Sequence, residues 1–129
     1  GKTKIGCITI AQRARNLDPW MCISPDSKVI RETSLPSFIE TVKYSGQYIS
    51  HVLSPDPKVT FKTLDNGVAF VTFKGAEKPD KLRGPNKAGI WFDEASIIAQ
   101  EAYEIGIGMC RYQSRLSPAF ATFTPRGLK

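Results

Sequence analysis

Short apolar runs, separated by polar stretches that contain glycine and proline, divide the chain into predicted strands and helices. Runs of strand length and composition occupy residues 20–23, 59–62, 68–73, 90–92 and 119–123, and we expect the last of these strands to be buried. Helical spacing predicts helices over 4–15, 28–44 and 100–112, with Ile5, Ile8 and Gln12 on one side of the first. Pro36 should kink or split the second helix. Residues 46–57 and 74–86 are predicted loops, and the first of them has room for one helical turn.

The clearest local signal is a β-hairpin. Asp65-Asn66-Gly67 separates two runs that are rich in β-branched and aromatic residues, and Asn-Gly favours the tight turn that joins antiparallel strands. Helices alternate with strands along the remainder of the chain. The pattern therefore predicts an α/β domain with a largely parallel sheet and an antiparallel insertion.

Composition excludes several classes of protein. The 129 residues suffice for one domain, and 41% hydrophobic with 23% charged residues is ordinary for a globular protein. The apolar runs are too short to span a membrane. Cys7, Cys22 and Cys110 form no CxxC pair, which argues against a zinc site or a disulfide framework and favours reducing, cytosol-like surroundings.

The net charge of +6 suits a polyanionic partner, although the basic residues are spread along the chain. Side chains that could contact phosphate include Lys74, Lys78, Lys81 and Arg115, but solvated surface charges are the more ordinary interpretation. His51 is the only histidine, and nothing near it in the sequence supports a catalytic role.

The strand predicted at 90–92 ends in two adjacent acids, Asp93 and Glu94. Ligands of open parallel sheets bind at the carboxyl ends of the strands. Two acids are costly to bury there unless a positive group such as Mg²⁺ with a phosphate approaches them. The alternative is a strand that simply runs into an exposed turn.

The chain begins with Gly1-Lys2-Thr3, which matches the last three residues of a P-loop and precedes the first predicted helix. In a P-loop the lysine reaches the β- and γ-phosphates, and the hydroxyl is a ligand of Mg²⁺. Gly-Lys-Thr is common by chance, so the tripeptide alone is poor evidence for a P-loop. Its position directly before a predicted helix makes the match more informative.

Four segments in this order resemble the ATPase domain of the large terminase subunit of tailed bacteriophages and prophages, the motor that packages DNA into procapsids. They are Gly1–Thr3, Ser24–Thr33, the block Gly75–Ala95 and Thr122–Gly127. The most specific part runs from Arg83 to Ala95. The resemblance implies a sheet of the P-loop NTPase (ASCE) type, with ATP and Mg²⁺ as cofactors.

The resemblance also implies roles for individual residues. Gly1, Lys2 and Thr3 would end the Walker A loop, and Asp93 would be the Walker B acid that holds Mg²⁺ together with Thr3. Glu94 would be the catalytic base, and Arg83 would act on a neighbouring subunit's nucleotide or else be an ordinary loop arginine. Thr122 and Thr124 would belong to the motif that couples hydrolysis to movement, although Phe123 stands where a small residue is usual.

For the parent assembly the resemblance implies double-stranded DNA, a portal protein and a small terminase subunit as partners. It further implies a homo-oligomeric ring, no membrane, and the cytoplasm of the infected bacterial host. The first strand of such a domain, most of its P-loop and the nuclease domain that follows it are missing from 1–129. We therefore expect a partial ATPase (motor) domain that hydrolyses ATP poorly by itself.

Two other functions remain open on the sequence. One is another P-loop nucleic-acid translocase or helicase core, which would share the Asp93–Glu94 edge. The other is a non-catalytic basic module that binds nucleic acid or a phage partner. The block from Arg83 to Glu94 favours the terminase over the helicase, whereas the missing P-loop favours the binding module.

Overall fold

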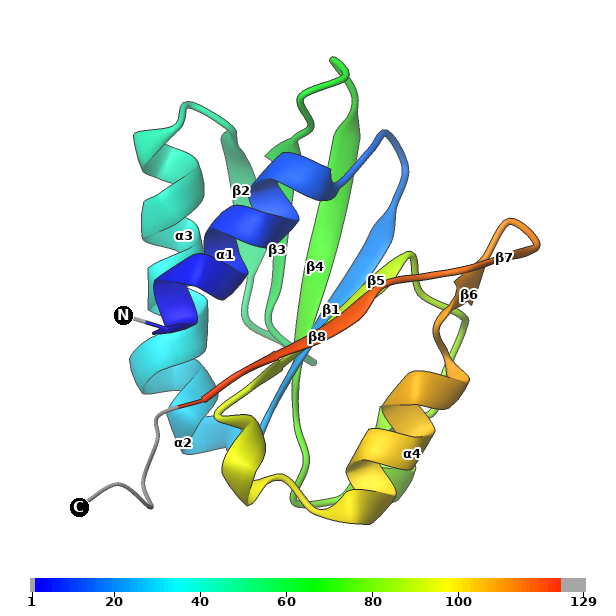
Figure 1. Cartoon of the computed structure of the whole chain (residues 1–129). Helices are drawn as coiled ribbons and strands as arrows, with labels where there is room; N and C mark the ends of the chain where they lie inside the picture. Colours follow the sequence, from blue (N-terminus) through cyan, green and yellow to red (C-terminus); the bar gives the residue numbers. More distant parts are fainter. Residues whose placement is uncertain (1, 124–129) are drawn as a thin grey trace.

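The computed structural model describes residues 2–123, in which helices and strands alternate around one sheet (Figure 1). The helices are α1 (Lys2–Arg13), α2 (Ser27–Val29), a π-helical turn η1 (Ile30–Ser34), α3 (Leu35–Tyr44), two 3₁₀ turns η2 (Pro79–Leu82) and η3 (Ala95–Ile97), and α4 (Gln100–Gly108). The strands are β1 (Pro19–Ser24), β2 (Tyr48–Val52), β3 (Lys58–Lys62), β4 (Val68–Gly75), β5 (Gly89–Asp93), β6 (Arg111–Tyr112), β7 (Arg115–Leu116) and β8 (Ala119–Thr122). No helix among these residues is long and apolar enough to cross a membrane.

The main sheet has the strand order β2-β3-β4-β1-β5-β8. Strands β4, β1, β5 and β8 run parallel, whereas β2, β3 and β4 are joined antiparallel. This confirms the predicted fold class, a largely parallel sheet with an antiparallel hairpin. Because the four parallel strands end at the same edge, Ser24 lies opposite Gly75, and Asp93 lies opposite Thr122.

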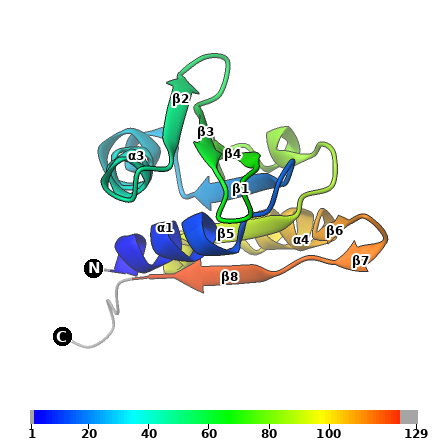
Figure 2. The same ribbon diagram turned by 90° about the horizontal axis from the view of Figure 1, so that it is seen from above.

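Each face of the sheet carries its own apolar core, as a parallel sheet covered on both sides requires. Trp20, Cys22 and Trp91 face α1 and α3, and the alternate residues Ile23 and Phe92 face α4. Helices α1 and α3 contact each other, and Figure 2 shows α3 beside β2 with α4 at the far end, next to β6. The alternation along β1 and β5 explains why β5 is buried throughout and β1 is buried from Trp20 to Ser24.

The predicted hairpin is confirmed as β3 and β4. At its turn Asn66 has a φ of 64°, in the left-handed region that asparagine tolerates better than most residues. The N–H of Thr63 donates to the carbonyl of Gly67 at 2.9 Å, which closes the turn.

The helix predicted over 28–44 is split, as Pro36 required, into α2, the π turn and α3. Asp26 caps α2 by accepting a hydrogen bond from the N–H of Val29 at 2.9 Å. The N–H of Leu35 then donates to the carbonyl of Ile30, five residues earlier. Pro36 follows within the first turn of α3, where its missing N–H costs nothing.

Two predictions about strands were wrong. Residues 46–57 are not a plain loop, because β2 forms there as an edge strand; four of its five residues are exposed, so it has no apolar alternation to recognise. Strand β8 exists but is not a buried strand. Among residues 2–123 it pairs with β5 alone, and Ala119 and Ala121 are exposed.

Ile5, Ile8 and Gln12 lie on one side of α1, and that side faces solvent, whereas Cys7 and Ile10 are buried. One helix prediction needs correction. The last helix ends at Gly108 rather than near Tyr112, since the chain then turns into the short β6–β7 hairpin.

Candidate functional site

Asp93 is the centre of a polar cluster at the carboxyl edge of the sheet. Its side chain is 1% exposed, yet it accepts hydrogen bonds from three hydroxyls and one backbone N–H. The donors come from four separate parts of the fold: Thr3 in α1, Ser34 in the π turn, Thr122 in β8 and the N–H of Glu94. The hydrogen bonds to this carboxylate therefore come from neutral groups of the protein.

Thr3 reaches Asp93 because the first turn of α1 lies at the carboxyl edge. The Thr3 Oγ1 donates to Asp93 Oδ1 at 3.1 Å, although the two residues are 90 positions apart in the sequence. Lys2 is the first residue of α1 and is exposed, next to Thr3. The structure thus places Lys2 and Thr3 at the edge where the sequence predicted them, while Gly1 lies outside the described residues.

Ser34 and Ser24 are parts of the cluster that the sequence did not indicate. The Ser34 hydroxyl donates to Asp93 Oδ2 at 2.6 Å and also contacts the Ser24 hydroxyl at 2.9 Å; both serines are fully buried. For Ser34 the one available sign was its place two residues before Pro36 inside a helical pattern, because such a break changes the direction in which side chains point.

Thr122 connects Asp93 to the neighbouring core. Its hydroxyl accepts a hydrogen bond from Trp91 Nε1 at 2.8 Å and donates to Asp93 Oδ1 at 2.9 Å. Both directions are fixed, since an indole N–H only donates and a carboxylate only accepts. Strand β8 is thereby tied to the acid through a buried hydroxyl. Thr124, the other predicted coupling residue, lies outside the described residues.

Glu94 follows the strand in a left-handed backbone conformation, with φ 53° and ψ 49°. A non-glycine residue in this region carries about 1–2 kcal/mol of backbone strain. The turn directs the half-buried Glu94 away from the line of β5, and its carbonyl accepts the N–H of Ile97 at 3.2 Å. Adjacent acids on a straight strand would point to opposite faces, so the turn determines how the two acids are presented.

Arg83 does not belong to the Asp93 cluster. It is exposed, directly follows η2, and lines a hollow of about 470 Å³ with Glu101 and Glu104 of α4. Within residues 2–123 no hydrogen bond or ion pair joins Arg83 to Asp93. The structure therefore does not bring Arg83 into the site of its own chain.

The oxygen atoms around Asp93 are suited to Mg²⁺, which takes few ligands from the protein, and not to a metal ion that is held by protein side chains alone. Among residues 2–123 no group of three or more His, Cys, Asp or Glu side chains could hold a metal ion. The ion pairs in this part of the chain are Lys4–Glu40 and Lys74–Asp56, so the buried Asp93 has no cationic partner. Mg²⁺ commonly takes one or two carboxylates and completes its shell with phosphate and water. A carboxylate beside the Thr3 hydroxyl supplies the protein part of such a shell.

Two thiols lie close to this cluster and are kept neutral by burial. Burial raises the pKa of Cys7 to about 12, and the negative charge of Asp93 adds to the shift. Burial likewise raises the pKa of Cys22 well above its usual value. The Cys22 Sγ lies 3.7 Å from the Ser24 hydroxyl, at the far end of the hydroxyl chain that leads to Asp93.

The free energy of unfolding should consequently fall as the pH rises from 9 toward 12. An unfolded thiol titrates near pH 9, whereas Cys7 in the fold holds its proton to about pH 12, so deprotonation favours the unfolded chain within this window. Urea unfolding at several pH values measures the slope. Cys7→Ala should make it shallower, and an unchanged slope would show that Cys7 does not contribute.

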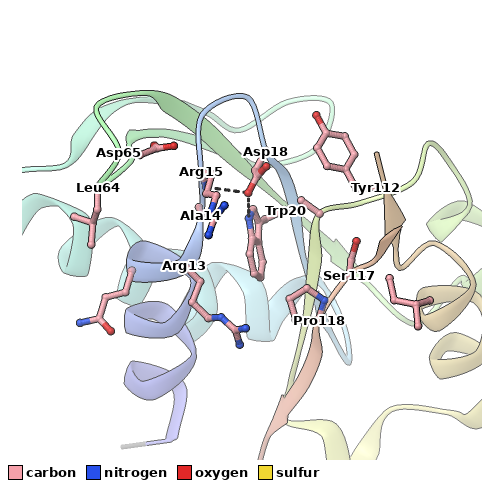
Figure 3. Close-up of a pocket in the computed structure, with 13 residues that line it drawn as sticks. Arg13, Ala14, Arg15, Asp18, Trp20, Leu64, Asp65, Tyr112, Ser117 and Pro118 are labelled. Atoms are coloured by element: carbon pink, nitrogen blue, oxygen red, sulfur yellow. Dashed lines mark hydrogen bonds between the residues drawn. The ribbon is translucent and has the colours of Figure 1, made fainter. Parts of the chain in front are cut away.

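Another hollow lies at the opposite edge of the sheet, away from Asp93. It has a volume of about 570 Å³ and is lined by the end of α1, the start of β1 and the β6–β7 region, with Arg13, Trp20 and Tyr112 among its residues (Figure 3). Two arginines and two aspartates line it, so the formal charges of its lining cancel. The charge of the hollow therefore does not indicate whether an anion or a cation would bind there. The site residues predicted from the sequence that are among the described residues, apart from Arg83, lie at the Asp93 edge instead.

Comparison with known proteins agrees with this geometry. The family described as terminase large subunit, T4likevirus-type, N-terminal, matches residues 1–129. No curated protein sequence matched the chain. Among solved structures, the large terminase of a thermophilic bacteriophage in complex with ADP superposes with a TM-score of 0.76 at 16% identity, over 94% of this chain and 30% of that one. The same enzyme in complex with ATP-gamma-S gives 0.70 at 17% identity, over 94% and 29%.

The large terminase ATPase domain of a Thermus phage has a TM-score of 0.61 at 16% identity, over 96% of this chain and 56% of that one. At such identities the likeness shows a shared fold. The chain spans about 30% of the length of the thermophilic bacteriophage terminase that it matches.

Proposed function

Since the chain belongs to the family of T4likevirus-type terminase large subunits, N-terminal part, we propose that it forms part of an ATPase motor that drives double-stranded viral DNA into a procapsid. The family confirms the resemblance drawn from the four sequence segments. The observation that carries the proposal is the contact between Thr3 and Asp93, because it joins the Walker-type hydroxyl and acid across 90 residues.

In this proposal the Asp93 edge binds Mg²⁺ with ATP. Lys2, exposed at the start of α1, contacts the β- and γ-phosphates together with the N–H groups at the helix start, and Gly1 precedes it. Thr3 and Asp93 hold the metal ion, which when bound neutralises charge on the phosphates. The solved complexes of the thermophilic bacteriophage terminase with ADP and ATP-gamma-S support a nucleotide as the ligand of this fold.

Glu94 is the general base in the proposal. Glu94 follows Asp93 in a left-handed turn, and in the proposal one acid holds the metal ion while the other orients the attacking water. Such a base contributes about 10²–10⁴-fold to a rate. Arg83, which is exposed and makes no hydrogen bond to Asp93 within residues 2–123, acts on the nucleotide of a neighbouring subunit in a homo-oligomeric ring.

Thr122 is the proposed start of the coupling motif, with Thr124 after it. A change in the hydrogen bonding of Asp93 reaches β8 through Thr122, because the two side chains share one hydrogen bond. The remaining partners in the proposal are double-stranded DNA, a portal protein and a small terminase subunit, in the cytoplasm of the infected host. The net charge of +6 is compatible with a DNA substrate.

Nucleotide binding by the chain tests this function. We expect ATP-gamma-S with Mg²⁺ to perturb the backbone amide resonances of residues 2–4 and 93–95, and Lys2→Ala to weaken that binding about 10- to 100-fold, the value of one charge-assisted hydrogen bond. Lys62→Ala is the matched control, since Lys62 is an exposed lysine at the end of β3 in the hairpin. Equal binding by both variants would contradict the assignment of Lys2, and the absence of any binding at the Asp93 edge would contradict the function.

A further inference from the structure

We propose that Ser34 is a positioning residue of the nucleotide site, which holds the Asp93 carboxylate in the orientation that receives the metal ion. The inference rests on the function proposed above and adds a residue to it. Ser34 is fully buried, and its hydroxyl lies 2.6 Å from Asp93 Oδ2, the shortest of the hydrogen bonds to this acid.

The direction of the hydrogen bonds behind Ser34 follows from the acid. An ionised carboxylate only accepts, so the Ser34 hydroxyl must donate its proton to Asp93. The contact of 2.9 Å between the two serines then requires the Ser24 hydroxyl to donate to Ser34. Cys22, whose thiol stays protonated, can donate to Ser24 in turn. The buried polar groups thus form a chain of donors directed at Asp93 Oδ2.

The π-helical turn aims Ser34 at the acid. Each residue of an α-helix advances by about 100°, so one extra residue in a turn redirects the side chains at its end. The turn Ile30–Ser34 contains that residue, and it ends on Ser34 itself. Single π turns are frequent at functional sites. Here the turn faces the carboxyl ends of β1 and β5, where Ser24 and Asp93 lie.

Ser34 and Thr122 hold different oxygens of the same carboxylate. Ser34 binds Oδ2 from the π turn, and Thr122 binds Oδ1 from β8, so the plane of the carboxylate is fixed from two sides. Thr3, the third hydroxyl, contacts Oδ1 at 3.1 Å and Oδ2 at 3.4 Å. Since Thr3 is itself a proposed ligand of the metal ion, Ser34 and Thr122 are the two hydroxyl donors that remain on Asp93 when Thr3 turns to the ion. Removal of such an outer partner typically costs about 10- to 100-fold in metal affinity.

The test measures Mn²⁺ binding by the whole chain in the presence of ADP, from the paramagnetic enhancement of water relaxation. Ser34→Ala should weaken Mn²⁺ binding about 10- to 100-fold and leave binding of metal-free ADP unchanged. Ser34→Thr, which keeps a hydroxyl, should restore most of the affinity. Ser24→Ala leaves the direct contact in place and should weaken binding less than Ser34→Ala does, because it removes only the donor behind Ser34.

Thr9→Val is the matched control, because the Thr9 hydroxyl on α1 donates within its own helix, to the carbonyl of Ile5. Unchanged Mn²⁺ affinity in Ser34→Ala would overturn the inference, and so would an equal loss in Thr9→Val. If the unmodified chain does not bind Mn²⁺ with ADP at the Asp93 edge, the proposed function fails and the inference fails with it. If the unmodified chain binds and Ser34→Ala binds equally well, only the inference fails.

Discussion

Asp93→Asn is expected to raise the free energy of unfolding of the metal-free chain by about 1–2 kcal/mol, and to abolish its stabilisation by Mg²⁺ with ADP. Asp93 is a nearly inaccessible carboxylate without a cationic partner among the described residues, and burial of such a charge is costly. Asparagine has almost the same shape and no charge. The stability of the fold and the function of the site should therefore respond in opposite directions.

Asparagine can satisfy every donor and acceptor at this position. Its carbonyl oxygen replaces Oδ1 and accepts from Thr122 and the N–H of the next residue, and its second amide N–H can donate to the half-buried Thr3 hydroxyl near Oδ2. Its amide group faces Ser34 and donates to it, after which Ser34 donates to Ser24 and the hydroxyl chain is reversed. Asp93→Ala has no such solution, because it leaves the buried hydroxyls without an acceptor at about 1–3 kcal/mol each.

Urea unfolding with and without Mg²⁺ and ADP measures both halves of this prediction. Ligand at 100 times its dissociation constant stabilises a protein by about 2.7 kcal/mol, so loss of that increment is readily detected. Asp80→Asn, at an exposed acid in η2, is the control and should stay within about 0.5 kcal/mol of the unmodified chain. A marked loss of stability in Asp93→Asn would show that the charge is already compensated in the fold.

Trp91→Ala is expected to lower the free energy of unfolding by about 3–5 kcal/mol, a large share of the roughly 5–15 kcal/mol typical of a whole domain. The side chain is fully buried in β5 between α1 and β8. The approach of α1 is so close that a Cβ atom on Gly6 would lie 2.2 Å from Trp91 Cε2. On its other side the indole stacks with Phe120 at 6.4 Å between ring centroids and donates to Thr122.

The melting temperature of Trp91→Ala should fall by roughly 10–20 °C, since 1 kcal/mol corresponds to about 4 °C in a chain of this size. Trp91→Phe keeps a ring but loses the indole N–H, so it should lower the free energy of unfolding by less than Trp91→Ala does. Its specific effect should be the loss of the hydrogen bond to Thr122. Tyr44→Ala, at a tyrosine that is 95% exposed, is the control for loss of an aromatic residue and should leave the melting temperature nearly unchanged. A small effect of Trp91→Ala would mean that α1 and β8 do not depend on this contact.

The local pattern of residues determined the strands and helices that form the middle of the fold. Trp20–Ile23 and Ile90–Phe92 were recognisable because fully buried strands are short apolar runs, and the hairpin was recognisable from Asn66-Gly67. The edge strands were misjudged, since β2 has exposed residues on both faces and β8 lies where one side has no neighbour. Burial depends on what packs against a strand, which a run of residues does not contain.

The sequence by itself determined that two acids follow a central strand and that a lysine and a threonine begin a helix, because these features lie within a few neighbouring residues. Only the tertiary structure decided that Thr3, Ser34 and Thr122 meet on Asp93, and that Arg83 does not. Serine and threonine hydroxyls occur both in solvent and in buried hydrogen bonds. The residue type alone therefore does not predict which group a hydroxyl will contact. The parallel register of the strands and the π turn before Pro36 bring these distant residues together.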